Sequence, residues 1–137
     1  MIAVRERVEV KGWGPWSLKA GVTHVRPAAQ ILDQMVTIRI HLDDCGDGNG
    51  PLQVISGSHR QGLLSDTKIQ NWSKKEAVSC AVHRGDAILM RPLLLHASSP
   101  ALHPSHRRVV HLEFAAHELP NGLEWHDRVA PWTAIFS

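Results

Sequence analysis

Residues 84–100, RGDAILMRPLLLHASSP, contain an apolar run that ends at a histidine. The run stays apolar up to His96 and then becomes small and polar. We expect a buried strand over residues 87–95. A strand held by its neighbours fixes the side chain at its end, which a metal ligand or catalytic base requires. His96 is therefore the leading candidate ligand, and the alternative is a polar group that caps the strand.

Arg107 and Ser98 extend this candidate site. Arg107 follows His96 by eleven residues and begins the next expected strand, 107–115. If the two strands pair as a hairpin around the loop 97–106, His96 and Arg107 face one cavity. Arginine clamps a carboxylate with two parallel hydrogen bonds, so the pair suits a metal with a carboxylate co-ligand. Ser98 adds a hydroxyl donor, and the alternative for Arg107 is an ordinary surface arginine.

The other histidines offer weaker candidates, although the chain has 10 histidines in 137 residues. Six of them fall in expected loops and are interpreted as surface or edge residues: His59, His83, His103, His106, His117 and His126.

The elements that position these residues are mostly strands. Residues 35–43 alternate cleanly, which predicts Val36, Ile38, Ile40 and Leu42 on one face and Thr37, Arg39, His41 and Asp43 on the other. Further strands are expected over 1–10, 20–26, 52–55, 78–82, 87–95 and 107–115, with a helical connection over 27–34 and a helix over 66–77. Many short strands with polar turns at 44–51 and 84–86 predict an all-β fold with minor helix, a sandwich or jelly-roll barrel.

Composition narrows the class of protein. At 137 residues the chain fits a single domain, 1–137. Its formal net charge is +2, with both signs mixed along the chain, which argues against a nucleic-acid partner. No apolar run reaches the roughly 18 residues of a membrane span, and charges interrupt the N-terminus where a signal peptide would be apolar. Two cysteines in unrelated contexts fit free thiols in a cytoplasmic protein.

Three segments together resemble the phytanoyl-CoA dioxygenase family, non-haem iron oxygenases that use 2-oxoglutarate. They are HLDDCGDGNGPLQVISGSHRQG, HRGDAILMRPLLLHASSP and HRRVVHLEF. The motifs are Asn49-Gly50-Pro51-Leu52, Gly57-Ser58-His59 and Gly85-Asp86, followed by His96 and Arg107 at the family's interval. The resemblance is clearest over residues 20–117, and it implies the double-stranded β-helix, or jelly roll, that the strand pattern also favours.

The resemblance implies a role for several positions. His96 matches the distal histidine ligand of Fe(II), and Arg107 matches the arginine that anchors the distal carboxylate of 2-oxoglutarate. Ser98 matches a hydroxyl that assists this arginine, and Arg39 matches a side chain that lines the co-substrate pocket. Fe(II), 2-oxoglutarate and O₂ are thus the implied cofactor and co-substrates. The turn residues Asn49, Gly50, Gly57 and Gly85 are expected to be structural.

The sequence departs from the family at its metal motif. Relatives carry an H-x-D triplet before the strand that holds Arg39, and none occurs between Met1 and Arg39. We therefore expect a jelly roll that is incomplete on its N-terminal side, with an exposed sheet edge prone to self-association. One literal H-x-D exists at His41-Leu42-Asp43, but in the family this segment aligns with the strand that leads into the Asn-Gly turn. Its use as a substitute ligand pair stays an alternative.

Two functions remain open from the sequence. In the first, the chain is the C-terminal larger part of an Fe(II)/2-oxoglutarate-dependent dioxygenase domain, inactive alone, whose parent hydroxylates an unidentified small molecule. In the second, it is a non-catalytic fragment or a barrel that binds a small carboxylate without iron chemistry. The sequence leaves the substrate open, as well as the choice between hydroxylation and halogenation.

Overall fold

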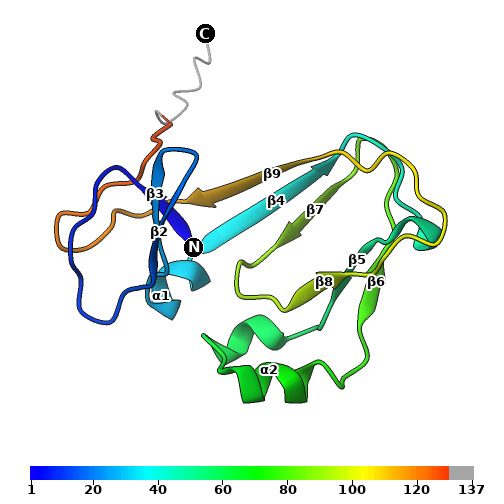
Figure 1. Ribbon diagram of the computed structural model, residues 1–137, viewed down its shortest axis with the longest axis horizontal. Helices are drawn as coiled ribbons and strands as arrows, with labels where there is room; N and C mark the ends of the chain where they lie inside the picture. Colours follow the sequence, from blue (N-terminus) through cyan, green and yellow to red (C-terminus); the bar gives the residue numbers. More distant parts are fainter. Residues whose placement is uncertain (130–137) are drawn as a thin grey trace, which may run out of the picture. The chain divides into compact units, whose positions relative to one another are not determined.

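The chain forms two compact units in the structure, a computed structural model that describes residues 1–129 (Figure 1). The smaller unit combines Met1–Ala28 with the chain from His117 onward, and the larger unit is Ala29–Ala116. No helix of the described residues is both long enough and apolar enough to cross a bilayer.

The smaller unit is built on a three-stranded antiparallel sheet in the order β1-β3-β2. Its strands are β1 (Ile2–Val4), β2 (Trp16–Lys19) and β3 (Val22–Val25). Its buried apolar core includes Ile2, Val4, Val25, Leu119 and Leu123. The expected strand over 20–26 is β3, but β1 is shorter than the expected 1–10. The hairpin partner β2 had not been predicted, although a two-residue turn at Ala20-Gly21 with positive φ at both positions suits a tight hairpin.

The larger unit holds two three-stranded antiparallel sheets, in a fold of the jelly-roll type. The first sheet has the order β7-β4-β9, from β7 (Ala87–Met90), β4 (Met35–His41) and β9 (Val109–Ala115). The second has the order β6-β5-β8, from β6 (Val78–Cys80), β5 (Leu52–Val54) and β8 (His96–Ser98). The unit also has four short helical segments: α1 (Ala29–Asp33) before β4, η1 (Asp47–Asn49) between β4 and β5, and η2 (Ser58–Gln61) and α2 (Asp66–Trp72) between β5 and β6. The all-β prediction with minor helix is confirmed.

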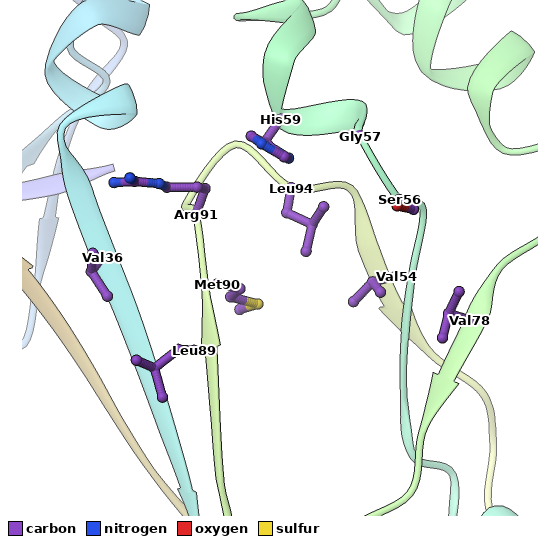
Figure 2. Close-up of a pocket in the computed structure, with 10 residues that line it drawn as sticks. All are labelled: Val36, Val54, Ser56, Gly57, His59, Val78, Leu89, Met90, Arg91 and Leu94. Carbon is purple, nitrogen blue, oxygen red and sulfur yellow. The ribbon is translucent and has the colours of Figure 1, made fainter.

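The polar face of β4 lies on the side of the second sheet. Thr37 is paired directly with Met90 of β7, so their side chains share one face of the sheet. Met90 lines a cavity of about 500 Å³ together with Val54 of β5, as Figure 2 shows. Val36 and Leu89, from the opposite face of the first sheet, also line this cavity. Thr37 and His41 are almost fully buried, whereas Val36, Ile38 and Ile40 are half-buried, so the face of β4 that carries Thr37 is the inner one.

The expected buried strand over 87–95 is wrong. The strand β7 ends at Met90, with Ala87 and Leu89 exposed. Pro92 lacks an N–H for a strand ladder, and the chain turns there, with the Leu94 N–H donating to the Arg91 carbonyl oxygen at 3.0 Å. His96 instead begins a separate strand in the other sheet.

The expected hairpin between the strands of His96 and Arg107 is also wrong. β8 pairs with β5, whereas β9 pairs with β4, so the two strands belong to different sheets. His96 and the strand that follows Arg107 therefore do not form a hairpin.

Three glycines of the recognised turns have positive φ angles, namely Gly50, Gly57 and Gly85, and the first two can be compared directly. Gly50 has φ +63° and Gly57 has φ +77°, values that favour glycine. They differ in their surroundings. A Cβ at Gly50 would lie 2.3 Å from the Ser99 carbonyl oxygen, whereas a Cβ at Gly57 would meet nothing within 4 Å. Gly50 is therefore required both by its φ angle and by the close passage of residues 99–107.

We predict that Gly50→Ala destabilises the chain much more than Gly57→Ala. The left-handed conformation alone costs a residue with a Cβ about 1–2 kcal/mol, and only Gly50 adds a backbone clash. Urea unfolding of the two variants measures the difference in the free energy of unfolding. Equal losses would contradict the packing of residues 99–107 against the Asn49-Gly50 turn.

Candidate active site

A stripe of polar side chains runs along the inner face of β4. Thr37 and His41 are each only 1% exposed, and Arg39 lies between them. Within residues 1–129, the Thr37 hydroxyl, the Arg39 Nε and both ring nitrogens of His41 are buried without a hydrogen-bond partner. Buried polar atoms are nearly always hydrogen-bonded in folded proteins. The stripe therefore has the properties of a surface that binds a polar ligand.

His41 is held neutral by its surroundings. Burial lowers the pKa of the imidazole, and the positive charges of Arg39 and, more weakly, Arg107 lower it further. The carboxylate of Asp86 opposes this shift without reversing it. A neutral imidazole offers one N–H donor and one acceptor, so His41 can take part in hydrogen bonds to a ligand of either polarity.

Arg107 lies next to this stripe at the end of β9. Val109 is paired directly with His41, and Arg107 precedes Val109 by two residues. The effect of Arg107 on the pKa of His41 agrees with that position. The Arg107 Nη1 donates to the carbonyl oxygens of Asn49, at 3.2 Å, and Gly50. Within the described part of the chain, Nη1 is the only nitrogen of this guanidinium that donates a hydrogen bond to the protein. Nε and Nη2 are therefore left to bind a carboxylate.

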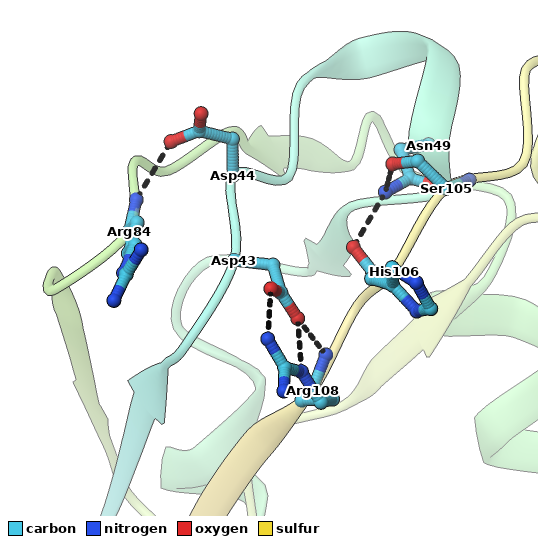
Figure 3. Close-up of polar contacts among 7 residues, drawn as sticks. All are labelled: Asp43, Asp44, Asn49, Arg84, Ser105, His106 and Arg108. Atoms are coloured by element: carbon cyan, nitrogen blue, oxygen red, sulfur yellow. Dashed lines mark hydrogen bonds and ion pairs between the residues drawn. The ribbon is translucent and has the colours of Figure 1, made fainter.

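The Asn49 side chain holds the segment before Arg107 in place. Its Oδ1 accepts from the Ser105 N–H at 3.0 Å, and its Nδ2 donates to the Ser105 hydroxyl at 2.8 Å (Figure 3). Asn49 is itself nearly buried at 8% exposure. The Asn-Gly turn therefore does more than reverse the chain, because it fixes the approach of Arg107 to the inner face.

His96 and Ser98 lie on the second sheet. His96 is paired with Val54 and Ser98 with Leu52, so they share the face that carries these two apolar side chains. Val54 lines the cavity with Met90, whereas His96 lines two other cavities, beside Leu95 and Ile69 of α2. Both polar residues are exposed, because β8 is an edge strand in the described chain.

The ring of His96 is nevertheless oriented. Its Nδ1 lies 2.8 Å from the Leu94 carbonyl oxygen, which can only accept, so Nδ1 carries the proton and Nε2 keeps a free lone pair. Metal-binding histidines are typically oriented by such a bond. The preceding residue is anchored too, since the Leu95 N–H donates to the buried Ser58 hydroxyl at 2.8 Å and its carbonyl accepts from Ile55 at 3.0 Å. Ser58 of the Gly-Ser-His motif thus positions His96.

The carboxylate of Asp43 is hydrogen-bonded to Arg108. The Arg108 Nε and Nη2 donate to its two carboxylate oxygens at 3.0 and 2.8 Å, and the Arg108 backbone N–H donates at 2.8 Å (Figure 3). These bonds hold the pKa of Asp43 well below its usual range. Among residues 1–129 no three His, Cys, Asp or Glu side chains come together in a group that could hold a metal. The geometry therefore speaks against His41-Leu42-Asp43 as a substitute ligand pair.

Sequence reasoning had missed Thr37 and the part that His41 has in the inner face. The signal was present, because both side chains fall on the polar side of the alternating strand 35–43. The alternation alone does not predict that the side chains of Thr37 and His41 are almost fully buried.

Comparisons with known proteins agree on the class of this chain. The sequence model of the family described as Phytanoyl-CoA dioxygenase (PhyH) matches residues 8–109. The crystal structure of AviO1 from Streptomyces viridochromogenes Tue57 is similar, with 27% identity and a TM-score of 0.57 over 80% of this chain and 46% of that one. The crystal structure of EvdMO1 is similar, with 25% identity and a TM-score of 0.55 over 75% of this chain and 23% of that one. No curated protein matches.

We predict that His41 makes the stability of the chain depend on pH. Because its pKa is lowered in the folded state, the unfolded chain binds the proton more readily. The stability is fully present above the ordinary value of 6.5 and is lost as the pH falls through the lower folded-state pKa. Urea unfolding between pH 8 and acidic pH should show a smaller loss for His41→Leu than for the wild type.

His83 provides the matched control, because its side chain is 90% exposed. His83→Leu should keep the pH dependence of the wild type. An unchanged dependence in His41→Leu would contradict the burial of a neutral His41.

Proposed function

Because the chain belongs to the phytanoyl-CoA dioxygenase family, we propose that it forms part of the catalytic barrel of an Fe(II)- and 2-oxoglutarate-dependent dioxygenase that hydroxylates a small molecule. Members of the family depend on Fe(II), 2-oxoglutarate and O₂. The chain spans less than half the length of each of the two solved structures reported above. The dioxygenase activity is therefore proposed for the whole protein and not for this chain alone.

The observation that carries the proposal is the row of buried polar atoms without partners on β4, next to Arg107. Burying such atoms without hydrogen bonds is costly, and a bound polar ligand removes the cost. 2-Oxoglutarate fits this donor set. Arg107 binds its distal carboxylate through two parallel hydrogen bonds, Ser98 assists with its hydroxyl, and Arg39 lines the pocket.

The metal site is only partly supplied by the described residues. His96 offers a free Nε2 and would hold Fe(II) as one ligand. Iron oxygenases of this type use two histidines and one carboxylate on one face, and residues 1–129 gather no such group. The residues present therefore do not complete an iron site, and we assign no step of the reaction to the metal.

The chain's own contribution is binding and orientation. Arg107 is fixed by the carbonyl oxygens of Asn49 and Gly50, so its guanidinium loses little freedom when a carboxylate binds. Val54 and Met90 give the cavity beside the first sheet an apolar lining. A dry, oriented pocket is what the protein must supply when the co-substrate and O₂ carry the chemistry.

We predict that Arg107→Gln weakens binding of 2-oxoglutarate to the 137-residue chain by at least tenfold. The variant removes the charge-assisted pair, and tenfold corresponds to about 1.4 kcal/mol. Calorimetric titration measures the affinity. Arg60→Gln removes an exposed arginine of η2 and should keep the wild-type affinity. Equal affinities in the wild type and Arg107→Gln would contradict the assigned role.

Turnover by the full-length gene product separates the enzyme from its alternative. With Fe(II) and O₂, the product should convert 2-oxoglutarate to succinate, and His96→Ala should reduce the rate at least a hundredfold, whereas His83→Ala at an exposed position should not. Binding of 2-oxoglutarate without any turnover would instead support a barrel that binds small carboxylates without iron chemistry.

Self-association through a sheet edge is a further part of the proposal. β9 and β8 are edge strands in the described chain, and Val110, Leu112 and Phe114 of β9 are 39–47% exposed. Unpaired strand edges template pairing with another chain, and lysine on an edge prevents it. Sedimentation velocity should show dimers or larger species that Val110→Lys reduces, while Leu18→Lys in the smaller unit does not. A monodisperse monomer would contradict it.

A further inference from the structure

We propose that the molecule oxidised by the whole protein is uncharged and mainly aliphatic, and that it binds in two adjoining cavities between α2 and the second sheet. This inference rests on the proposed function, because it takes His96 as a residue of the reacting centre. His96 lines both cavities, so a molecule held in them lies beside that centre.

The two cavities, termed the α2 cavities, share one wall. Their volumes are about 250 and 270 Å³, and both are lined by Ile69 of α2, Leu95 and His96. Small-molecule sites in proteins occupy roughly 300–1,000 Å³. One molecule that extends along the shared wall would therefore fill a site of ordinary size, which neither cavity provides alone.

The second sheet presents a separate face to the α2 cavities. Gln53 is paired with Ala97 in register, and the Ile55 N–H donates to the Leu95 carbonyl oxygen at 3.0 Å, so the pairing continues past the strand ends. These four residues line one of the α2 cavities. Val54 alternates with Gln53 and Ile55 along the strand and lines the cavity of about 500 Å³ instead. The α2 cavities are therefore distinct from the cavity beside the first sheet.

The lining of the α2 cavities selects against charged ligands. None of the described residues that line them is Asp, Glu, Lys or Arg, and the polar side chains besides His96 are Gln53 and Ser73. Most of the other lining is aliphatic and includes Leu63, Leu64, Leu93 and Leu94. An ion placed here would lose part of its hydration without gaining a counter-charge. An uncharged molecule with an aliphatic body meets no such cost, and the amide of Gln53 can bind one hydroxyl or carbonyl group of it.

The helix α2 leaves its apolar surface uncovered above these cavities. No residue of Asp66–Trp72 is buried, and Ile69 is 38% exposed although it lines both cavities. Leu63, just before the helix, is 47% exposed. Helices of globular proteins normally bury an apolar stripe against a neighbouring element. An aliphatic molecule between α2 and the sheet would cover these side chains, which supports an apolar occupant.

1-Octanol is the probe for the α2 cavities, and octanoate is its anionic counterpart. In calorimetric titrations of the 137-residue chain, octanol should bind saturably and at least tenfold more tightly than octanoate. Absence of octanol binding, or equal affinities for the two probes, would overturn the inference.

Three variants locate the binding. Ile69→Glu puts a charge in the shared wall and should weaken octanol binding at least tenfold, whereas Ala97→Leu narrows one cavity without a charge and should weaken it about threefold or more. Leu89→Glu is the matched control, because Leu89 is 66% exposed and lines the cavity beside the first sheet. It should keep the wild-type affinity. Thermal melts establish that each variant is folded, and loss of binding in folded Leu89→Glu but not in folded Ile69→Glu would contradict the assigned site.

NMR of the histidine rings tests whether the bound molecule lies beside His96. Octanol should shift the ring signals of His96 and leave those of His83, which is 90% exposed, unchanged. Saturable binding without a shift of His96 would overturn the substrate site.

Titration with 2-oxoglutarate distinguishes this inference from the proposed function. Ile69→Glu should bind 2-oxoglutarate with the wild-type affinity, and Arg107→Gln should bind octanol with the wild-type affinity. Octanol binding that depends on Ile69, without any binding of 2-oxoglutarate, would support the apolar site and contradict the proposed co-substrate. Binding of 2-oxoglutarate without octanol binding would support the proposed function and overturn the apolar site.

Discussion

The larger unit is organised around buried polar atoms that have no partner within the described chain. The Thr37 hydroxyl, the Arg39 Nε and both nitrogens of His41 lie on the inner face of β4, where a folded protein normally places apolar groups or satisfied hydrogen bonds. Each such atom costs stability when nothing binds it. We interpret this polar face of β4 as a ligand-binding surface. The elements around it leave a ligand access to it.

Two turns position the remaining residues of the candidate site. Gly50 allows residues 99–107 to pass closely, and Asn49 binds Ser105, so Arg107 arrives beside His41 with one nitrogen already held by the turn. On the second sheet Ser58 anchors Leu95 and thereby directs His96. The motifs Asn-Gly-Pro-Leu and Gly-Ser-His, which touch no co-substrate in this account, thus position the residues that do.

The alternation of residues 35–43 allowed the strand β4 and the division of its side chains between two faces to be predicted, because strand period is a local property. The same holds for the positive-φ glycines of the turns. The path of the chain after Met90 was not predicted, since the apolar run over 87–95 looks continuous although Pro92 ends the strand within it. Pairing of β8 with β5 and of β9 with β4 depends on long-range contacts that no local pattern contains. The unpaired burial of His41 could likewise be seen only in three dimensions.

The most direct test of the central claim is a nitrogen-detected NMR titration of the 137-residue chain with 2-oxoglutarate. The signals to follow are the arginine Nε–H groups and the histidine rings. Binding at the inner face should shift Arg107 most, and His41 and the Ser98 amide with it, while Arg108, held by Asp43, stays unchanged. Shifts confined to residues of the smaller unit, or none at saturating ligand, would contradict the claim that the inner face of β4 is a co-substrate pocket.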